Sequence, residues 1–254
     1  LPTALNAYEM FAQPRKAYIL FGVEPELDCY DPQQAVAALK EAALVVMLTP
    51  FGDGAAQDYA DVLLPITPFT ETSGSFVNTE GRIQSFTGVV RPLGDARPGW
   101  KVLRVLGNLL ALAGFDQNSS EQVRDEIVPA GTTFVAGLDN RVSGVPLSLM
   151  VTAGELQRIA DVPIYFADPL ARRAAALQKT RDAVAPTARM NAATLARLAV
   201  TDGAPVRLRQ GNGEAVLTAR ADETVPAGCV RVAAAHVTTA ALGEMFGAIN
   251  VERA

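Results

Sequence analysis

The hydrophobic residues in the first part of the chain gather in short, continuous runs. Ala17 to Val23 (AYILFGV) and Leu44 to Leu48 (LVVML) are almost entirely apolar, and Val62 to Leu64 form a third, shorter run. Continuous apolar runs are typical of parallel strands buried on both faces. Between the first two runs, Asp31-Pro32 offers a helix N-cap followed by proline at the first helical position. The pattern predicts a strand–helix–strand unit and therefore a parallel α/β sheet.

This predicted sheet is only part of a Rossmann-like layer, which normally has five or six strands. We expect the first strands to lie upstream of Leu1. Either Ala17–Val23 or Leu44–Leu48 would then have an unpaired flank. Exposed strand edges recruit other chains, so the sequence predicts self-association of the truncated chain.

Helical patterns follow. A strongly apolar stretch from Trp100 ends on Gly114, a plausible glycine just after a helix C-terminus. Ser119, with Gln122 three residues later, resembles a capping box for a helix through Val128. Pro129 to Pro146 is rich in Gly, Pro, Ser and Asn, and is the best linker candidate.

The last part of the chain has a different pattern. Short β segments are separated by turn residues, and a helix from Ala192 to Leu198, capped by Asn191, lies between the first segment and the other three. The predicted β segments are Pro163–Phe166, Val206–Arg209, Ala215–Ala221 and Cys229–Ala233. The sequence therefore predicts an α/β region at residues 1–128, a linker region at 129–162 and a small β-barrel domain at 163–254.

Composition and charge exclude several classes of function. The chain has 254 residues, 49% of them hydrophobic, and a net charge of −5, which is unfavourable for binding nucleic acid. The densest basic run, with Arg172, Arg173, Lys179 and Arg181, is interpreted as a solvated helix face. Cys29 and Cys229 are isolated, so neither a disulfide framework nor an iron–sulfur or zinc site is expected. No apolar run approaches the roughly 20 residues needed to span a bilayer.

The segment from Tyr59 to Gln84 (YADVLLPITPFTETSGSFVNTEGRIQ) is the strongest candidate site. Its hydroxyls, amide and glycines could bind phosphates or could only order a long irregular loop. Glu71 and Glu80 do not form a catalytic pair by their spacing. His236 is the only histidine, and no nucleophile motif accompanies it. We interpret it as a hydrogen-bonded packing residue.

Several stretches resemble one superfamily. ADVLLP and ETSGSFVNTEGRIQ resemble the signature of molybdopterin oxidoreductases. FGVEPELDCYDP, DARPGWKVLRVLGNLL and PIYFADPLARRAAALQKT resemble the large iron–sulfur subunit of bacterial NADH–quinone oxidoreductase, respiratory complex I. The stretch ARMNAATLARLAVTDGAPVRLRQGNGEAVLTARAD resembles the superfamily's double-psi β-barrel module.

The resemblance to the complex I subunit implies a structural role. The chain would be the C-terminal scaffold of a subunit that supports electron transfer from NADH to quinone. It would hold no catalytic, cofactor-binding or metal-ligating residue, and the iron–sulfur clusters would lie in the missing N-terminal part. The implied partners are the other subunits of the peripheral arm, on the cytoplasmic side of the inner membrane, with no membrane insertion and no nucleic acid.

Two alternatives remain open. The chain could be the distal half of a molybdopterin-dependent oxidoreductase such as a formate dehydrogenase, with Asn78, Gly81 and Asn191 near the pterin dinucleotide. It could also be an independent small-molecule binding module. The sequence upstream of Leu1 separates the scaffold from the enzyme, because only the enzyme needs a ligand for molybdenum.

Overall fold

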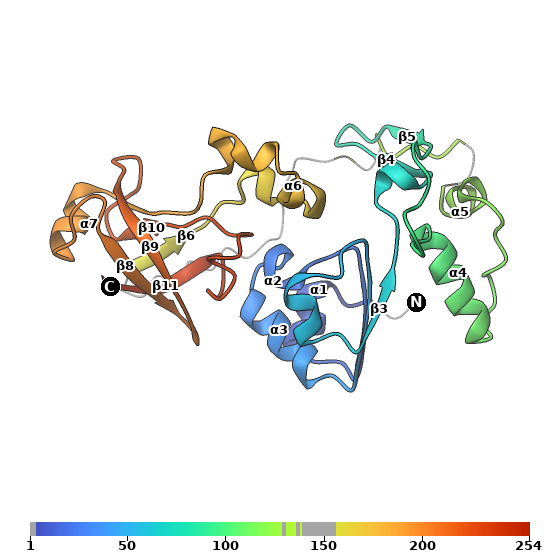
Figure 1. Ribbon diagram of the computed structural model, residues 1–254, viewed down its shortest axis with the longest axis horizontal. Coiled ribbons are helices and arrows are strands. Elements are labelled where there is room, and N and C mark those ends of the chain that lie inside the picture. Colours follow the sequence, from blue (N-terminus) through green and yellow to red (C-terminus); the bar gives the residue numbers. More distant parts are fainter. Residues whose placement is uncertain (1–3, 129–130, 136–137, 139–155) are drawn as a thin grey trace.

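The computed structural model describes residues 4–128, 131–135, 138 and 156–254. Figure 1 shows the barrel strands at one end of the molecule, helices α1 to α3 in the middle, and β4, β5, α4 and α5 at the other end. Most of the expected linker region, 129–162, lies outside the described residues.

The predicted parallel sheet is confirmed. Its three strands lie in the order β1-β2-β3, with β1 paired to β2 and β2 to β3 in parallel. The strands are β1 (Ala17–Phe21), β2 (Leu44–Thr49) and β3 (Val62–Pro65). Because β2 is the central strand, the expectation of an open flank at Leu44–Leu48 is wrong. Among the described residues β1 and β3 each pair only with β2, so Ala17–Phe21 has an unpaired flank and β3 forms the other edge of the sheet.

Short helices surround this sheet. They are α1 (Ala7–Ala12), α2 (Pro25–Asp28), α3 (Pro32–Glu41) and the 3₁₀ turn η1 (Gly54–Asp58). The N-cap of α3 is the predicted one, since the Asp31 carboxylate accepts a hydrogen bond from the Gln34 N–H at 3.1 Å. The side chains that form the core of this region are Tyr18, Leu20, Ala38, Leu39, Val45, Met47, Ala56 and Tyr59.

The segment expected to be an irregular loop is largely a β-hairpin. After the 3₁₀ turn η2 (Phe69–Glu71), strands β4 (Gly74–Val77) and β5 (Ile83–Phe86) pair antiparallel. Across the hairpin the Ser75 and Ser85 hydroxyls lie 2.8 Å apart, and the Phe76 and Phe86 rings stack at 5.0 Å. Most of its side chains are exposed or half-buried, so the apolar alternation that indicates a strand is absent.

The next two helices are α4 (Gly99–Leu109) and α5 (Ser120–Ile127). Helix α4 ends earlier than predicted. Ala111 has a φ of 54°, and the chain folds back until the Phe115 ring occupies the space that a Cβ on Gly107 would take. The predicted N-cap of α5 is confirmed, because the Ser119 hydroxyl accepts from the Gln122 N–H at 3.3 Å.

The C-terminal domain is a closed barrel of six strands, in the order β10-β6-β11-β8-β9-β7. Its core lies inside the barrel and includes Met190, Leu208, Val230, Val232 and Leu242, each fully buried. The strands are β6 (Leu156–Ile159), β7 (Ala188–Met190), β8 (Pro205–Gln210), β9 (Gly213–Ala221), β10 (Cys229–Arg231) and β11 (Phe246–Arg253). The prediction of a β-barrel is confirmed. Its double-psi connectivity stays a prediction.

The barrel differs from the sequence prediction at four places. Strand β6 lies within the expected linker region, so the barrel begins before residue 163. Residues 163–166 are not a strand, because the Phe166 N–H donates to the Pro163 carbonyl at 2.8 Å and closes the 3₁₀ turn η4 (Ile164–Phe166). Neither the three-residue strand β7 nor strand β11, which has a mixed sequence, was predicted. Four-residue and mixed strands show too little alternation to be recognised.

Three short helical segments link η4 to strand β7: α6 (Pro169–Arg173), η5 (Leu177–Lys179) and η6 (Arg181–Ala183). Helix α7 (Ala192–Arg197) lies between β7 and β8. The predicted cap of α7 is confirmed, with the Asn191 side chain accepting from the Thr194 N–H at 2.8 Å. Within the described parts of the chain, no helix has the length and apolarity to cross a membrane.

Candidate functional site

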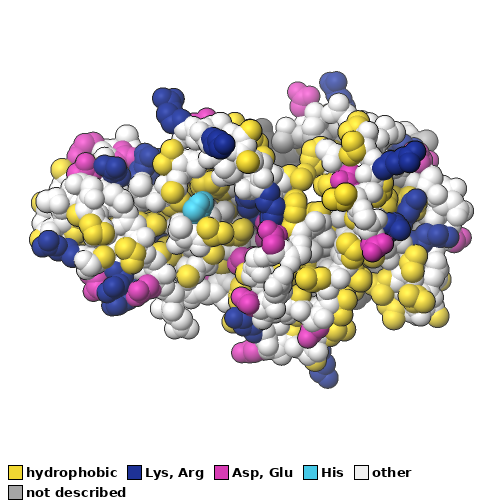
Figure 2. Space-filling view, viewed as in Figure 1, with side chains coloured by type: hydrophobic (Ala, Val, Ile, Leu, Met, Phe, Trp, Pro, Cys, Tyr) yellow, Lys and Arg dark blue, Asp and Glu magenta, His cyan; other side chains and the backbone are white. Residues whose placement is uncertain are grey.

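A cavity of about 410 Å³ lies where the α/β region meets the barrel domain. We call it the interdomain cavity. Apolar side chains such as Leu27, Phe166 and Val237 form part of its wall, and charged side chains form the rest. Its volume falls within the range of roughly 300–1,000 Å³ typical of small-molecule sites. Figure 2 shows the single histidine, in cyan, near the middle of this face, with basic side chains beside it.

Two adjacent arginines of α6 cross from the barrel domain to the α/β region. Arg172 Nη1 lies 2.7 Å from Glu24 Oε2, and Arg172 Nη2 also pairs with Asp28. Arg173 Nη2 lies 2.6 Å from Glu24 Oε1 and 2.9 Å from Asp53 Oδ1. Glu24 therefore accepts from both guanidinium groups, and we call these five side chains the interdomain ion cluster.

Local sequence places both arginines at the cavity. The Asp168 carboxylate caps α6 by accepting from the Leu170 and Ala171 N–H groups at 2.8 and 3.1 Å, and Pro169 fills the first helical position. The helix is only five residues long, so Arg172 and Arg173 lie in its last turn. Arg172 Nε is fixed by the Phe166 carbonyl at 2.6 Å.

The interpretation of this basic run as a solvated face is wrong for its first two residues. The side chains of Arg172 and Glu24 are each 9% exposed, and that of Arg173 is 26% exposed. The Arg173 guanidinium also lies 4.1 Å from the centre of the Phe51 ring. Glu24 and Asp28, four residues apart, could have suggested a partner for these arginines, but nothing in the sequence pairs residues about 150 positions apart.

Electrostatics at Glu24 reflect two opposing effects. Burial pushes the pKa of the Glu24 carboxyl upward, but hydrogen bonds and charge from Arg173 and Arg172 outweigh burial and hold the pKa below its ordinary value of 4.5. Burial alone would lower the pKa of Arg173, and its bonds to Glu24 and Asp53 raise it instead. Glu24 and Arg173 are therefore both ionised at neutral pH.

This shift predicts acid sensitivity. A carboxyl whose pKa is lower in the folded state stabilises the fold above its unfolded pKa, and that stabilisation is lost as the pH falls through the folded pKa. We expect the melting temperature to fall as the pH drops below about 4.5. The check is a series of thermal melts from neutral pH to about pH 3. A Glu24→Gln variant should show a flatter acid slope, and an unchanged slope would contradict the assignment to Glu24.

His236 borders the same cavity as a packing residue. Its Nδ1 accepts from the Thr238 N–H at 3.2 Å and lies 2.8 Å from the Thr238 hydroxyl, while its ring packs on Phe166 with 4.7 Å between centroids. Burial lowers the pKa of His236 below its usual value. The prediction of a hydrogen-bonded packing histidine is confirmed.

The described residues do not include a metal centre. Among them there is no group of three or more His, Cys, Asp or Glu side chains that could hold a metal ion. Cys29 and Cys229 are both half-buried thiols outside any disulfide. Burial, together with the charge of Asp28, raises the pKa of the Cys29 thiol to about 11, so it is protonated at neutral pH.

The three residues named for a pterin site do not come together. Asn78 and Gly81 share the tip of the β4–β5 hairpin, where the Asn78 side chain accepts from the N–H groups of Glu80 and Arg82 at 3.0 and 2.9 Å. Asn191 caps α7 in the barrel domain, at the far end of the molecule from β4 and β5 (Figure 1). The Asn78 and Asn191 side chains each have a local structural partner.

Gly81 gives a direct stability prediction. Its φ is +76°, and a Cβ there would lie 3.0 Å from the Val135 backbone nitrogen. We expect Gly81→Val to lower the free energy of unfolding by about 1–3 kcal/mol, since a β-branched residue disfavours this conformation. Thermal or urea unfolding measures the loss, with Gly52→Val as control, because Gly52 has open space around it. Equal losses in both variants would remove the argument.

Comparisons with known proteins find a family match for each of the two regions. Residues 1–109 match the family described as Molybdopterin oxidoreductase, and residues 171–250 match the Molydopterin dinucleotide binding domain. These findings support the predicted resemblance of this chain to the molybdopterin oxidoreductase superfamily. The interdomain cavity is therefore lined by residues of both matched regions.

Several proteins with similar sequences are named as formate dehydrogenases. The chain is 38% identical over 88 residues to proteins named "Putative formate dehydrogenase" in Staphylococcus aureus strains USA300 and NCTC 8325, and 44% identical to the protein of that name in strain MRSA252. The match spans 34% of this chain and 9% of the length of those relatives. None of these relatives is named as a subunit of complex I, so that finer prediction finds no support among them.

A solved structure agrees on the fold. The acetylene hydratase from Pelobacter acetylenicus superposes with a TM-score of 0.66 at 16% identity, over 97% of this chain and 46% of that chain. At that identity the likeness shows the fold alone. It supports the arrangement of the partial sheet and the barrel within one fold.

Proposed function

We propose that this chain is part of a molybdopterin-dependent oxidoreductase of the formate dehydrogenase type. The observation that best supports this proposal is that residues of both segments matching this superfamily line the interdomain cavity. The likeness to the staphylococcal proteins supports the formate dehydrogenase type. In this proposal the chain contributes one wall of the pterin dinucleotide site.

The donor set of the cavity fits part of such a ligand. Arg173 Nε is buried and has no hydrogen-bond partner among the described residues, so it offers a donor to a phosphate or ring oxygen. The carboxylates of Glu26 and Asp53, at the same cavity, can accept from the amino groups of a pterin or purine ring. The described residues do not fit the metal itself, because they form no ligand group.

The roles of the residues follow from these contacts. When bound, the molybdenum–pterin group would supply the redox chemistry. Arg172 and Glu24 would hold α6 against the α/β region, Arg173 would orient an oxygen of the dinucleotide, and the apolar wall with Phe166 would exclude water from that part of the ligand.

Measuring the cofactor in the protein purified from its native host tests the proposal. We expect pterin dinucleotide and molybdenum, together with formate-dependent reduction of a dye. An Arg173→Lys variant keeps the positive charge but loses the guanidinium fork, and we expect its pterin content to fall at least about tenfold. The control is Arg82→Lys in the hairpin, where the arginine side chain is 71% exposed. A native protein without pterin would overturn the proposal.

The scaffold role in respiratory complex I is the second candidate. One observation favours it: the arginines and carboxylates at the cavity neutralise one another without any ligand. In that case the interdomain ion cluster would fill the place of a cofactor, and the partners would be other subunits of the peripheral arm. The same pterin measurement separates the two candidates, because the scaffold predicts none.

A further inference from the structure

A second cavity, of about 610 Å³, opens on the barrel domain. Four arginines line it, from different elements: Arg181 of η6, Arg189 of β7, Arg220 of β9 and Arg231 of β10. We call it the arginine pocket. Three aspartates also line it, so the pocket has one more positive than negative side chain.

The aspartates neutralise these guanidinium groups unequally. Arg231 is fully paired, because its Nε and Nη2 lie 3.2 and 3.0 Å from the two oxygens of Asp161. Arg189 reaches Asp222 only at 3.5 Å. Asp222 is already engaged by Thr224, whose N–H and hydroxyl donate to it at 3.0 and 2.6 Å.

The other two arginines are weakly held. Arg220 reaches Asp202, outside the pocket, at 3.8 Å, and both side chains are 55% exposed. The Arg181 side chain has no hydrogen bond or ion pair with any described residue, and Asp182 beside it has none either. Three guanidinium groups therefore keep most of their N–H donors available to a ligand.

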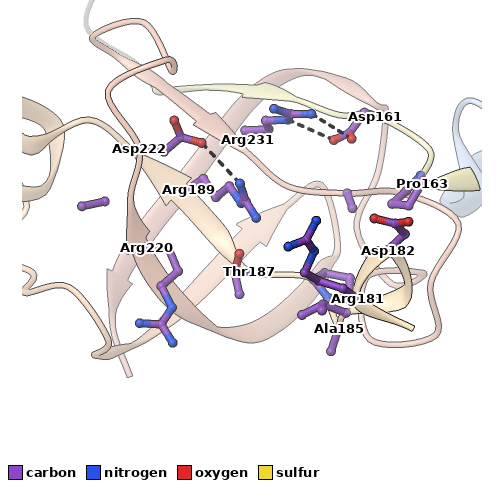
Figure 3. A pocket seen from close by; sticks show the side chains of 14 residues that line it. Asp161, Pro163, Arg181, Asp182, Ala185, Thr187, Arg189, Arg220, Asp222 and Arg231 are labelled. Carbon is purple, nitrogen blue, oxygen red and sulfur yellow. Dashed lines mark hydrogen bonds and ion pairs between the residues drawn. The ribbon is translucent and has the colours of Figure 1, made fainter. Parts of the chain in front are cut away.

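Figure 3 shows how the available donors are oriented. Arg181 and Arg189 extend into the same part of the pocket, and the Thr187 hydroxyl faces the space between them. Two positive side chains directed into one cavity repel each other unless an anion lies between them. Guanidinium forks match the oxygens of a phosphate group, and a hydroxyl adds a further donor.

We propose that the arginine pocket binds the phosphate groups of a phosphorylated molecule of nucleotide size. The ligand contacts Arg181, Arg189 and Thr187, while Arg231 stays paired with Asp161 and forms the wall. The volume of the pocket, about 610 Å³, suits a molecule of that size. The site is separate from the interdomain cavity, since the two cavities share no lining residue.

Titration with inorganic pyrophosphate tests this site without any enzyme activity. We expect calorimetry to detect binding to the unaltered protein and at least about a tenfold weaker affinity in Arg181→Gln and in Arg189→Gln. Arg82→Gln removes the same charge from the hairpin and should bind as the unaltered protein does. Melting temperatures show whether each variant is folded. Absence of pyrophosphate binding, or equal weakening in all three variants, would overturn the proposal.

A second arm of the experiment identifies the source of the phosphate. If binding persists in protein already loaded with pterin dinucleotide, the ligand is a separate phosphorylated molecule, as proposed. If the loaded dinucleotide abolishes pyrophosphate binding, the pocket is part of the dinucleotide site, and the proposal of a separate phosphate site is overturned. Neither result depends on whether the protein oxidises formate.

Discussion

We expect Glu24→Gln to lower the free energy of unfolding by about 3–5 kcal/mol, the cost typical of removing one partner from a buried charge pair. Among the described residues, Glu24 is the one carboxylate that contacts both Arg172 and Arg173, at 2.7 and 2.6 Å. Glutamine has nearly the same shape, so the substitution leaves no cavity. It removes the negative charge, so less negative charge remains to neutralise the two partly buried guanidinium groups.

Urea unfolding and limited proteolysis measure this effect. Because the cluster joins α6 to the α/β region, we expect faster cleavage of the variant as well as a lower unfolding free energy. The matched control is Glu80→Gln, which removes a carboxylate 3.9 Å from Arg82 with a side chain 74% exposed. An exposed pair of that kind contributes at most about 1 kcal/mol. A loss at Glu24 no larger than at Glu80 would contradict the buried role.

A second contact joins the same two regions. The Gln33 side chain of α3 donates to the carbonyls of Gln210 and Ala241 at 2.7 and 2.8 Å, and accepts from the Asn212 N–H at 3.1 Å. Gln33 therefore satisfies backbone groups around the β8–β9 turn. Separating the regions would expose this amide as well as the interdomain ion cluster, so the cavity between them is fixed at two places.

The sequence predicts the parts of the fold that local patterns determine. The continuous apolar runs identify β1, β2 and β3, and the caps at Asp31, Ser119 and Asn191 are where the side chains suggest. It does not predict β11 or the β4–β5 hairpin, because strands with mixed or exposed side chains lack a clear period. Boundaries such as the end of α4 depend on contacts like that between Phe115 and Gly107, which local patterns do not record.

The site was less predictable than the fold. The resemblance to molybdopterin enzymes suggests Asn78, Gly81 and Asn191 as neighbours of a pterin dinucleotide. The structure gives Asn78 and Asn191 local hydrogen bonds and gives Gly81 a positive φ. The charged groups that line the two cavities come from segments distant in the sequence, and a single sequence shows no pairing between them. Arg181 was grouped with Arg172 and Arg173 as one solvated face, but it lines a different cavity.

Replacing Arg158 is the second substitution that we expect to reduce stability strongly. This side chain of β6 is only 2% exposed, and Nη1 donates to Gln210 Oε1 at 3.0 Å and to the carbonyls of Gly243 and Glu244 at 3.0 and 3.2 Å. No carboxylate pairs with it among the described residues. Burial lowers the pKa of Arg158 to about 10, so the group remains charged at neutral pH.

We expect Arg158→Met to lower the free energy of unfolding by about 2–4 kcal/mol. Methionine relieves the cost of burying a charge, but it leaves Gln210 Oε1 and the Gly243 carbonyl without their donor, and each buried unsatisfied acceptor costs about 1–3 kcal/mol. The Glu244 carbonyl keeps one hydrogen bond, because it also accepts from Gln210 Nε2 at 2.9 Å. Urea unfolding gives the value, with Arg253→Met as control, since Arg253 is exposed on β11. If Arg158→Met is neutral or stabilising, the cost of burying the charge exceeds the value of its hydrogen bonds, and Arg158 is not what holds β6 to the turn at Gly243.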